Sequence, residues 1–241
     1  MKPFQLFAVL LSAKLVYGSS NAACNALTSA LPGRVFFPVK TGSEEYVDHM
    51  EHYSRSASEN STVRFSQSLS KMLEPSFAIL TYTQLQVIAN GDTRSPFAIK
   101  GGGHTGILGF SSTLGVQISM SRFSEIDYDK TTSTAKIGAS QIWNEVYARL
   151  VSDGVKVVGG RVPGVGVSGL SLGGGYSFFT DQYGLSVDTI VSYDLVLPNG
   201  TFIKVSNETE PDLFFALKGG FNNFGIVTSF TMQTFPQTDV W

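Results

Sequence analysis

The sequence is poor in cysteine and in charge, and each scarcity excludes a class of protein. Cys24 is the only cysteine among 241 residues. It is either a free thiol or half of a bridge whose partner is missing, so the chain is no disulfide-stapled domain. Charged residues make up 15% of the sequence, the net charge is -2, and no run of Lys or Arg occurs. A nucleic-acid partner is therefore not expected, because binding would need a clustered basic face.

Long apolar runs are also missing, which argues against a membrane-spanning helix. The stretch from Phe4 to Leu11 is much shorter than the roughly 20 apolar residues that span a bilayer. Lys2 precedes it and Val16-Tyr17-Gly18 follows it, as in a secretory signal with a cleavage site. We therefore predict a signal peptide over residues 1–18, a secreted protein, and no membrane association after its removal.

Glycine is abundant, with 25 residues, and gathers in three clusters. These are Gly101–Gly103 before His104, Gly159–Gly169, and Gly173–Gly175. Several backbone N–H groups can converge on one anion where side chains are absent, so such loops suit the phosphates of a dinucleotide. A P-loop is excluded because no Gly-Lys-Ser/Thr occurs.

The segment from Gly164 to Gly169 fits G-x-G-x-x-G, but its context does not favour a Rossmann fold. That fingerprint needs a preceding strand and a helix that opens within it. Here Leu170–Gly175 follows, a poor helix at about 1 kcal/mol for each glycine. A nicotinamide dehydrogenase is therefore disfavoured.

The remaining patterns predict an α+β fold, since strands and helices are interspersed without a regular βαβ rhythm. The predicted domains are a helical and loop segment over 19–70 and the main domain over 71–241. An Asn199-Gly200 turn predicts a hairpin over 190–205. The other predicted elements are strands over 96–99, 116–120, 155–158 and 225–235, a helix over 141–152 capped by Ser140 and ended by Gly154, and a helix over 212–218 opened by Pro211.

Two histidine patterns could carry chemistry. His104 stands inside a glycine loop, where the imidazole is either hydrogen-bonded to the turn or a nucleophile or base. His49 and His52 are three residues apart, a spacing that can place two metal ligands on one helix face. No third ligand is evident, so we expect a solvated helix face there and no metal site.

Taken together, these motifs resemble the FAD-binding domain of the berberine-bridge-enzyme-like oxidases and the vanillyl-alcohol-oxidase group, in a fungal secreted version. The resemblance covers residues 96–241 in order. It is carried by Phe97-Ala98-Ile99-Lys100-Gly101-Gly102-Gly103-His104, Gly159 to Gly175, Tyr183-Gly184-Leu185-Ser186-Val187-Asp188, Pro211 to Gly220, and Asn223-Phe224-Gly225-Ile226-Val227-Thr228.

The resemblance implies a two-subdomain fold with FAD between the subdomains and a covalent bond from His104 to the flavin 8α-methyl group. It implies hydride transfer from a small-molecule substrate to the flavin, and reoxidation by dioxygen with release of hydrogen peroxide. The implied cofactor-binding residues are Gly101, Gly102, Gly103, His104, Thr105, Gly160, Val162, Gly164, Gly166, Gly169, Gly173, Gly174, Gly225, Ile226 and Val227.

Departures from the family pattern are informative. Val162 stands where doubly linked members carry a second flavin-binding cysteine, so a single link is expected. Gly106 replaces a tyrosine that often faces the substrate. The usual partner of Cys24 would fall near Phe77, where a strand and half a helix are absent. The chain also stops at Trp241, where members continue into a substrate domain, so we expect that domain to be lacking or supplied in trans.

Two functions therefore stay open: an oxidase acting on a small, secondary-metabolite-like compound, and a truncated flavin-binding fragment without catalysis. Substrate residues, including a catalytic base, are not identified. Three Asn-x-Ser/Thr triplets predict N-glycosylation of the exported chain. They begin at Asn60, Asn199 and Asn207.

Overall fold

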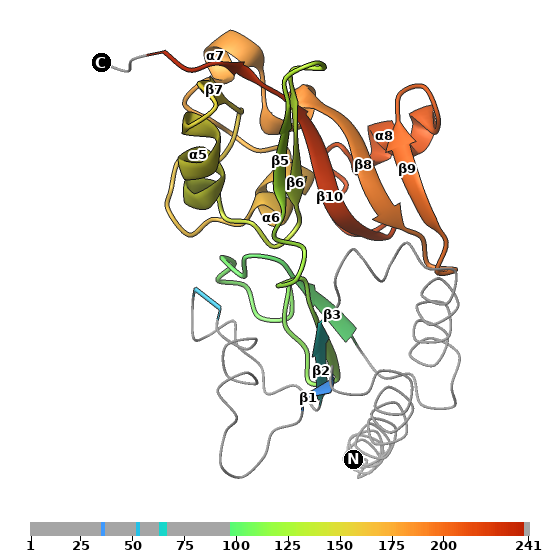
Figure 1. Ribbon diagram of the computed structural model, residues 1–241. Helices are drawn as coiled ribbons and strands as arrows, with labels where there is room; N and C mark the ends of the chain where they lie inside the picture. The colour runs from blue at the N-terminus through green and yellow to red at the C-terminus, as the bar shows by residue number, and fades with distance from the viewer. Residues whose placement is uncertain (1–34, 37–51, 54–62, 67–96, 239–241) are drawn as a thin grey trace, which may run out of the picture.

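The computed structural model describes residues 35–36, 52–53, 63–66 and 97–238. These residues form two main sheets, one below the other in Figure 1, with helices beside the upper one. Several predictions fall outside the described residues. They concern the signal peptide over 1–18, Cys24, His49, Asn60, Phe77 and the last residues, 239–241.

The smaller sheet has four strands in the order β1-β2-β4-β3. Its strands are β1 (Val35–Phe36), β2 (Val63–Ser66), β3 (Phe97–Lys100) and β4 (Val116–Ser119). β4 runs parallel to both β2 and β3. β4 confirms the strand predicted over 116–120, but all four of its residues are buried, without the alternation of inward and outward side chains that is typical of a half-buried strand. An inner parallel strand is covered on both faces, which explains the difference.

The predicted segment 19–70 contributes β1 and β2 to this sheet, so it is not made only of helices and loops. β2 pairs with β4, about 50 residues further along the chain. The two predicted segments thus share a sheet, and the boundary near residue 70 stays a prediction. A short run such as Val63–Ser66 becomes a strand through pairing with a distant neighbour, which local sequence does not reveal.

The larger sheet is antiparallel, with the order β5-β6-β10-β8-β9. Its strands are β5 (Ile126–Asp129), β6 (Thr134–Gly138), β8 (Ile190–Val196), β9 (Phe202–Ser206) and β10 (Ile226–Gln233). The predicted hairpin is confirmed as β8 and β9. Gly200 has φ of 84° in its turn, a conformation that favours glycine. A mixed sheet and an antiparallel sheet, with helices interspersed between the strands, confirm the α+β prediction.

Helices cover the upper sheet: α5 (Trp143–Val151), α6 (Val167–Leu172), α7 (Thr180–Tyr183), the 3₁₀ helix η2 (Ser186–Thr189) and α8 (Pro211–Leu217). A two-stranded ribbon joins β7 (Val155–Lys156) to β11 (Phe235–Pro236). α8 confirms the helix expected after Pro211. α6 begins at Val167, inside Gly164–Gly169, so the expectation that no helix opens within this segment is wrong, although the helix is only six residues long.

The start of α5 differs from the prediction, and the difference positions the second glycine loop. Ser140 does not cap the helix, because its Oγ donates to the carbonyl oxygen of Phe123 at 2.8 Å. The Val167 N–H instead donates to Gln141 O at 2.8 Å, and the Trp143 N–H donates to Val165 O at 3.0 Å. The chain before α5 is therefore held against the chain that enters α6.

A cluster of polar side chains in mutual contact lies across neighbouring strands of the antiparallel sheet. Lys136 Nζ lies 2.6 Å from Asp194 Oδ2, and the Ser229 hydroxyl donates to the same oxygen at 2.8 Å. Glu125 lies nearby, with a buried Oε1 that has no hydrogen-bond partner among the described residues. Burial raises the pKa of Glu125 above its ordinary 4.5. Asp127 and Asp194 add smaller upward effects, while its backbone hydrogen bond and Lys136 oppose the shift.

We predict that Glu125→Gln stabilises the protein at neutral pH more than at acid pH. A carboxyl whose pKa is raised by folding costs stability as pH rises from the unfolded value through the folded one. Below the ordinary pKa of 4.5 both states are protonated, so the variant should gain little there. Melting temperatures at pH 4 and pH 7 measure the difference, with the exposed Glu208→Gln as control. An equal shift at both pH values would contradict the prediction.

Candidate functional site

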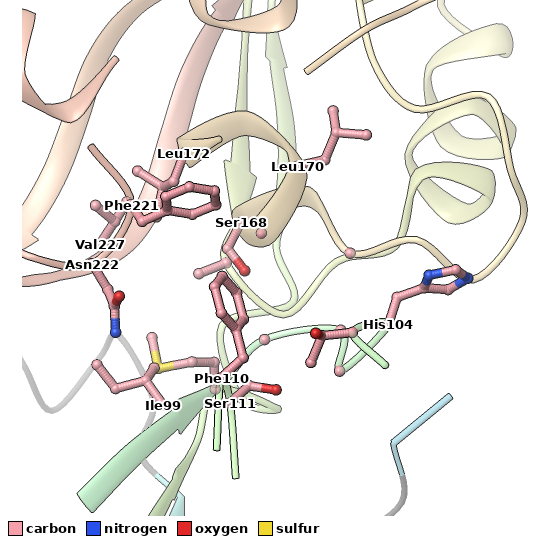
Figure 2. Close-up of a pocket in the computed structure, with 18 of the residues that line it drawn as sticks. Ile99, His104, Phe110, Ser111, Ser168, Leu170, Leu172, Phe221, Asn222 and Val227 are labelled. Carbon is pink, nitrogen blue, oxygen red and sulfur yellow. The ribbon is translucent and has the colours of Figure 1, made fainter. Parts of the chain in front are cut away.

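A cavity of about 300 Å³ lies where the first glycine loop meets α6 and the segment before β10. Figure 2 shows the aromatic rings of Phe110 and Phe221 near its centre, with Leu172 and Val227 beside them. The lining includes ten of the fifteen predicted cofactor-binding residues. They are Gly101, Gly102, Gly103, His104, Thr105, Gly166, Gly169, Gly225, Ile226 and Val227.

Three of these glycines bring the two loops into direct contact. A Cβ on Gly102 would lie 2.5 Å from Gly166 Cα, and one on Gly166 would lie 2.7 Å from Gly102 N. A Cβ on Gly101 would lie 2.1 Å from the Ser168 hydroxyl. No real Cβ approaches another atom so closely, so glycine at these positions lets backbone pack on backbone. Loop packing is thus a second reason for these glycines besides phosphate binding.

Gly169 differs from them, because nothing lies within 4 Å of a Cβ built there. It is exposed, lies inside α6 and lines the cavity. Packing therefore does not require glycine at this position, and alanine would be a better helix former by about 1 kcal/mol. Its missing side chain leaves room on the cavity side for a ligand.

His104 lies at the edge of the cavity, after Gly103 with φ of 70°. In Figure 2 its ring is directed away from Phe110 and Phe221. A Cβ on Gly164 would lie 3.8 Å from His104 Cδ2, so the two loops also meet here. His104 Nε2 is buried and makes no hydrogen bond to any described residue. Buried polar atoms normally have a hydrogen-bond partner. We therefore expect a bound group to contact the unpaired Nε2 of His104.

Several lining residues were not predicted from the sequence. They are mostly apolar or hydroxyl side chains: Ile99, Phe110, Ser111, Met120, Ala139, Val165, Ser168, Leu170, Leu172, Phe221 and Asn222. Phe110 and Phe221 contact each other edge to face, with ring centroids 5.5 Å apart. Phe221 has φ of 54°, which is uncommon for a bulky residue, and its N–H donates to Leu172 O at 3.1 Å. No local sequence signal marks such a residue.

Five predicted residues do not line this cavity. Gly160 and Val162 line a second cavity of about 480 Å³ beside α5, and Gly164 lies next to His104. A Cβ on Gly160 would lie 2.5 Å from Trp143 Cδ1, and one on Gly173 would lie 2.7 Å from the Phe221 ring. Gly174 has φ of 111° and accepts the Val187 N–H at 3.1 Å. Close packing therefore explains why glycine stands at positions 160 and 173, and backbone conformation explains the glycine at position 174.

His52 does not lie on a solvated helix face as predicted, and His49 lies outside the described residues. His52 is buried and non-helical, and its Nε2 lies 3.2 Å from Ser111 O and 3.1 Å from Ser111 Oγ. Among the described residues, no group of three or more His, Cys, Asp or Glu could hold a metal ion. Nor does that part of the chain contain a helix long and apolar enough to cross a membrane.

Comparison with known proteins relates this geometry to flavoproteins. A family model described as an FAD binding domain matches residues 87–206. The FAD-dependent monooxygenase tpcD of Cochliobolus heterostrophus is 36% identical over 231 residues. That match covers 93% of this chain and 43% of the relative.

Solved structures show the same fold. The xylooligosaccharide oxidase from Myceliophthora thermophila C1, in complex with xylobiose, is 28% identical with a TM-score of 0.74, covering 89% of this chain and 43% of that one. The glucooligosaccharide oxidase from Acremonium strictum, which carries a 6-S-cysteinyl, 8α-N1-histidyl FAD, is 25% identical with a TM-score of 0.71. That match covers 90% of this chain and 43% of the oxidase. The chain thus spans less than half the length of these relatives, and the predicted two-subdomain fold is confirmed.

Proposed function

Because this chain belongs to the family of FAD-linked oxidoreductases that share this FAD-binding domain, we propose that it oxidises a small, secondary-metabolite-like organic substrate. The substrate gives a hydride to a flavin attached through His104, and dioxygen reoxidises the flavin. The observation that carries the proposal is the unpartnered, buried Nε2 of His104 at the edge of a glycine-lined cavity.

The residues present fit an FAD. Backbone N–H groups of Gly101, Gly102, Gly103 and Gly166 would hold phosphate oxygens, since these residues line the cavity and carry no side chain. Gly169 leaves open space, while Phe110, Leu172 and Phe221 provide an apolar wall. When bound, FAD supplies the two-electron chemistry, and the protein positions it and excludes water. The cavity of about 300 Å³ is at the small end for ligand sites, so it would take one part of the cofactor.

A histidyl link is supported by the glucooligosaccharide oxidase, whose FAD is joined to a histidine and a cysteine. Here Val162 offers no thiol, so we propose one link, through His104. A bond forms between an imidazole nitrogen and the 8α-methyl carbon, while one N–H and one C–H bond break. The two protons and two electrons released end on dioxygen as hydrogen peroxide.

The secondary-metabolite-like substrate class comes from the family resemblance of the sequence, because the name of tpcD, an FAD-dependent monooxygenase, gives a reaction type and no substrate. The structural relative acts on a xylooligosaccharide, which makes a sugar the second candidate.

The test is to purify the chain, precipitate it in acid and examine the pellet for yellow colour and a flavin-fluorescent band on a denaturing gel. The native protein is then mixed without oxygen with panels of phenols, alcohols and sugars while visible flavin absorbance is followed. Bleaching by a substrate, and peroxide release on adding air, is the expected result. A bound flavin that no substrate bleaches would favour the non-catalytic flavin-binding fragment. Freely released flavin would contradict the covalent link.

We further propose that the protein is exported and N-glycosylated. Asn199 and Asn207 are both exposed, at the tip of the β8–β9 hairpin and in the turn after β9. Expression in a eukaryotic host should give secreted protein whose mass falls on glycosidase treatment. Thr201→Ala and Thr209→Ala should each remove one step of that shift, because each destroys one acceptor triplet. Retention in cells with no shift would contradict both proposals.

A further inference from the structure

His52 and Tyr53 contact the first glycine loop although they lie about 50 residues before it. The Tyr53 N–H donates to Gly103 O at 3.0 Å. His52 is buried, and its imidazole donates to Ser111 O at 3.2 Å. The partners of these two hydrogen bonds, Gly103 and Ser111, both line the cavity, and Gly103 directly precedes His104. The dipeptide is therefore held at the candidate site by the hydrogen bonds of the His52 imidazole and of the Tyr53 N–H.

Ser111, which binds this dipeptide, is itself held by the four-stranded sheet. Gln117 is fully buried on β4, and its Nε2 donates to Ser111 O at 3.0 Å and to Ala98 O at 3.2 Å. Ser111 O thus joins His52 to the side chain of a central strand. A hydrogen-bonded chain of this kind restrains the backbone of Tyr53.

The ring of Tyr53 stacks on the imidazole of His104, with centroids 4.0 Å apart and planes 20° apart. Tyr53 is 76% exposed, so burial in a core does not explain the contact. The lone pair of an imidazole nitrogen lies in the ring plane. A partner on the ring face therefore holds the plane without engaging a nitrogen lone pair, and Nε2 has no hydrogen-bond partner among the described residues.

We propose that Tyr53 is a positioning residue for covalent flavin attachment: it holds the His104 ring so that a nitrogen points at the carbon it must bond. This inference rests on the proposed link through His104. Displacing a nucleophile lowers the reaction rate steeply, since a misplacement of about 1 Å can lower the rate on the order of a hundredfold. Tyr53→Ala should thus slow attachment roughly tenfold to a hundredfold. Tyr53→Phe keeps the ring and should attach flavin at the wild-type rate.

The experiment uses the full chain produced without flavin in a riboflavin-starved host. FAD is added, samples are denatured at intervals, and the fluorescent band on a denaturing gel gives the rate of attachment. Phe215→Ala is the control, because Phe215 is similarly exposed at 79% and lies on α8. Slow attachment in Tyr53→Ala, with unchanged melting temperature and initial FAD binding, supports positioning. Wild-type rates in Tyr53→Ala, or slow attachment in Tyr53→Phe, overturn it.

The result for the wild-type protein distinguishes the proposed covalent link through His104 from the proposed positioning role of Tyr53. If wild type attaches flavin and Tyr53→Ala does so equally fast, only the role of Tyr53 fails. If wild type attaches none, the covalent link fails, and the positioning role fails with it. Proton NMR of the flavin-free protein tests the contact directly, since the Tyr53 ring should shift the His104 ring protons upfield. Loss of that shift in Tyr53→Ala and its retention in Tyr53→Phe is expected, and an unshifted His104 in wild type contradicts the stack.

Discussion

His104→Ala is expected to bind FAD but to release all of it on acid denaturation, whereas the wild-type protein retains it. The imidazole is the proposed nucleophile inside the glycine loop, and its Nε2 has no hydrogen-bond partner among the described residues. Alanine removes the only group proposed to form the bond. The cavity wall and the glycine loops stay in place, because the His104 ring is directed away from Phe110 and Phe221 (Figure 2).

The measurement is flavin fluorescence on a denaturing gel, together with the mass of the peptide that contains residue 104. His49→Ala is the control, since it removes an imidazole outside the glycine loops. His52→Ala is not suitable, because His52 is buried and bonded to Ser111 at the cavity. An attached flavin in His104→Ala, or a modified peptide elsewhere in the chain, would show that another residue carries the link.

Gly102→Ala is expected to destabilise the protein and abolish flavin binding together. The new methyl group would meet the backbone of Gly166 at 2.5 Å, and backbone cannot rotate out of the way as a side chain can. Overpacking of this kind costs about 1–3 kcal/mol. For a chain of this size, each kcal/mol lowers the melting temperature by roughly 2–4 °C. The two loops must also move apart, which would displace the N–H groups proposed to hold phosphate.

Gly169→Ala is the matched comparison, because the same change is made where a Cβ meets nothing within 4 Å. The flavin-free variant should melt at or above the wild-type temperature, since alanine favours the helix α6. Its affinity for FAD should nevertheless fall, because the methyl group occupies cavity space. Differential scanning calorimetry of the flavin-free proteins and FAD titration measure the two effects. Destabilisation by Gly169→Ala, or normal flavin binding by Gly102→Ala, would contradict this division of roles.

Local sequence signals predicted much of the fold and part of the site. Asn199-Gly200, Pro211 and Gly154 act through backbone geometry that depends on the residue itself, so the hairpin, α8 and the end of α5 lie where expected. Ser140 failed as a cap because its hydroxyl donates to Phe123, a residue 17 positions away. A local preference of about 1 kcal/mol is easily overridden by such a contact.

The sequence by itself determined that His104 stands inside a glycine-rich loop and that further glycine loops follow, because residue identity can be read without the fold. Only the tertiary structure decided which glycines serve which purpose. Gly102 and Gly166 touch each other, Gly160 makes room for Trp143, and Gly169 faces open space. It also decided that Phe221 lines the cavity and that Tyr53 stacks on His104. These contacts join residues far apart along the chain, and their positions follow from the packing of two sheets and their loops rather than from any local pattern.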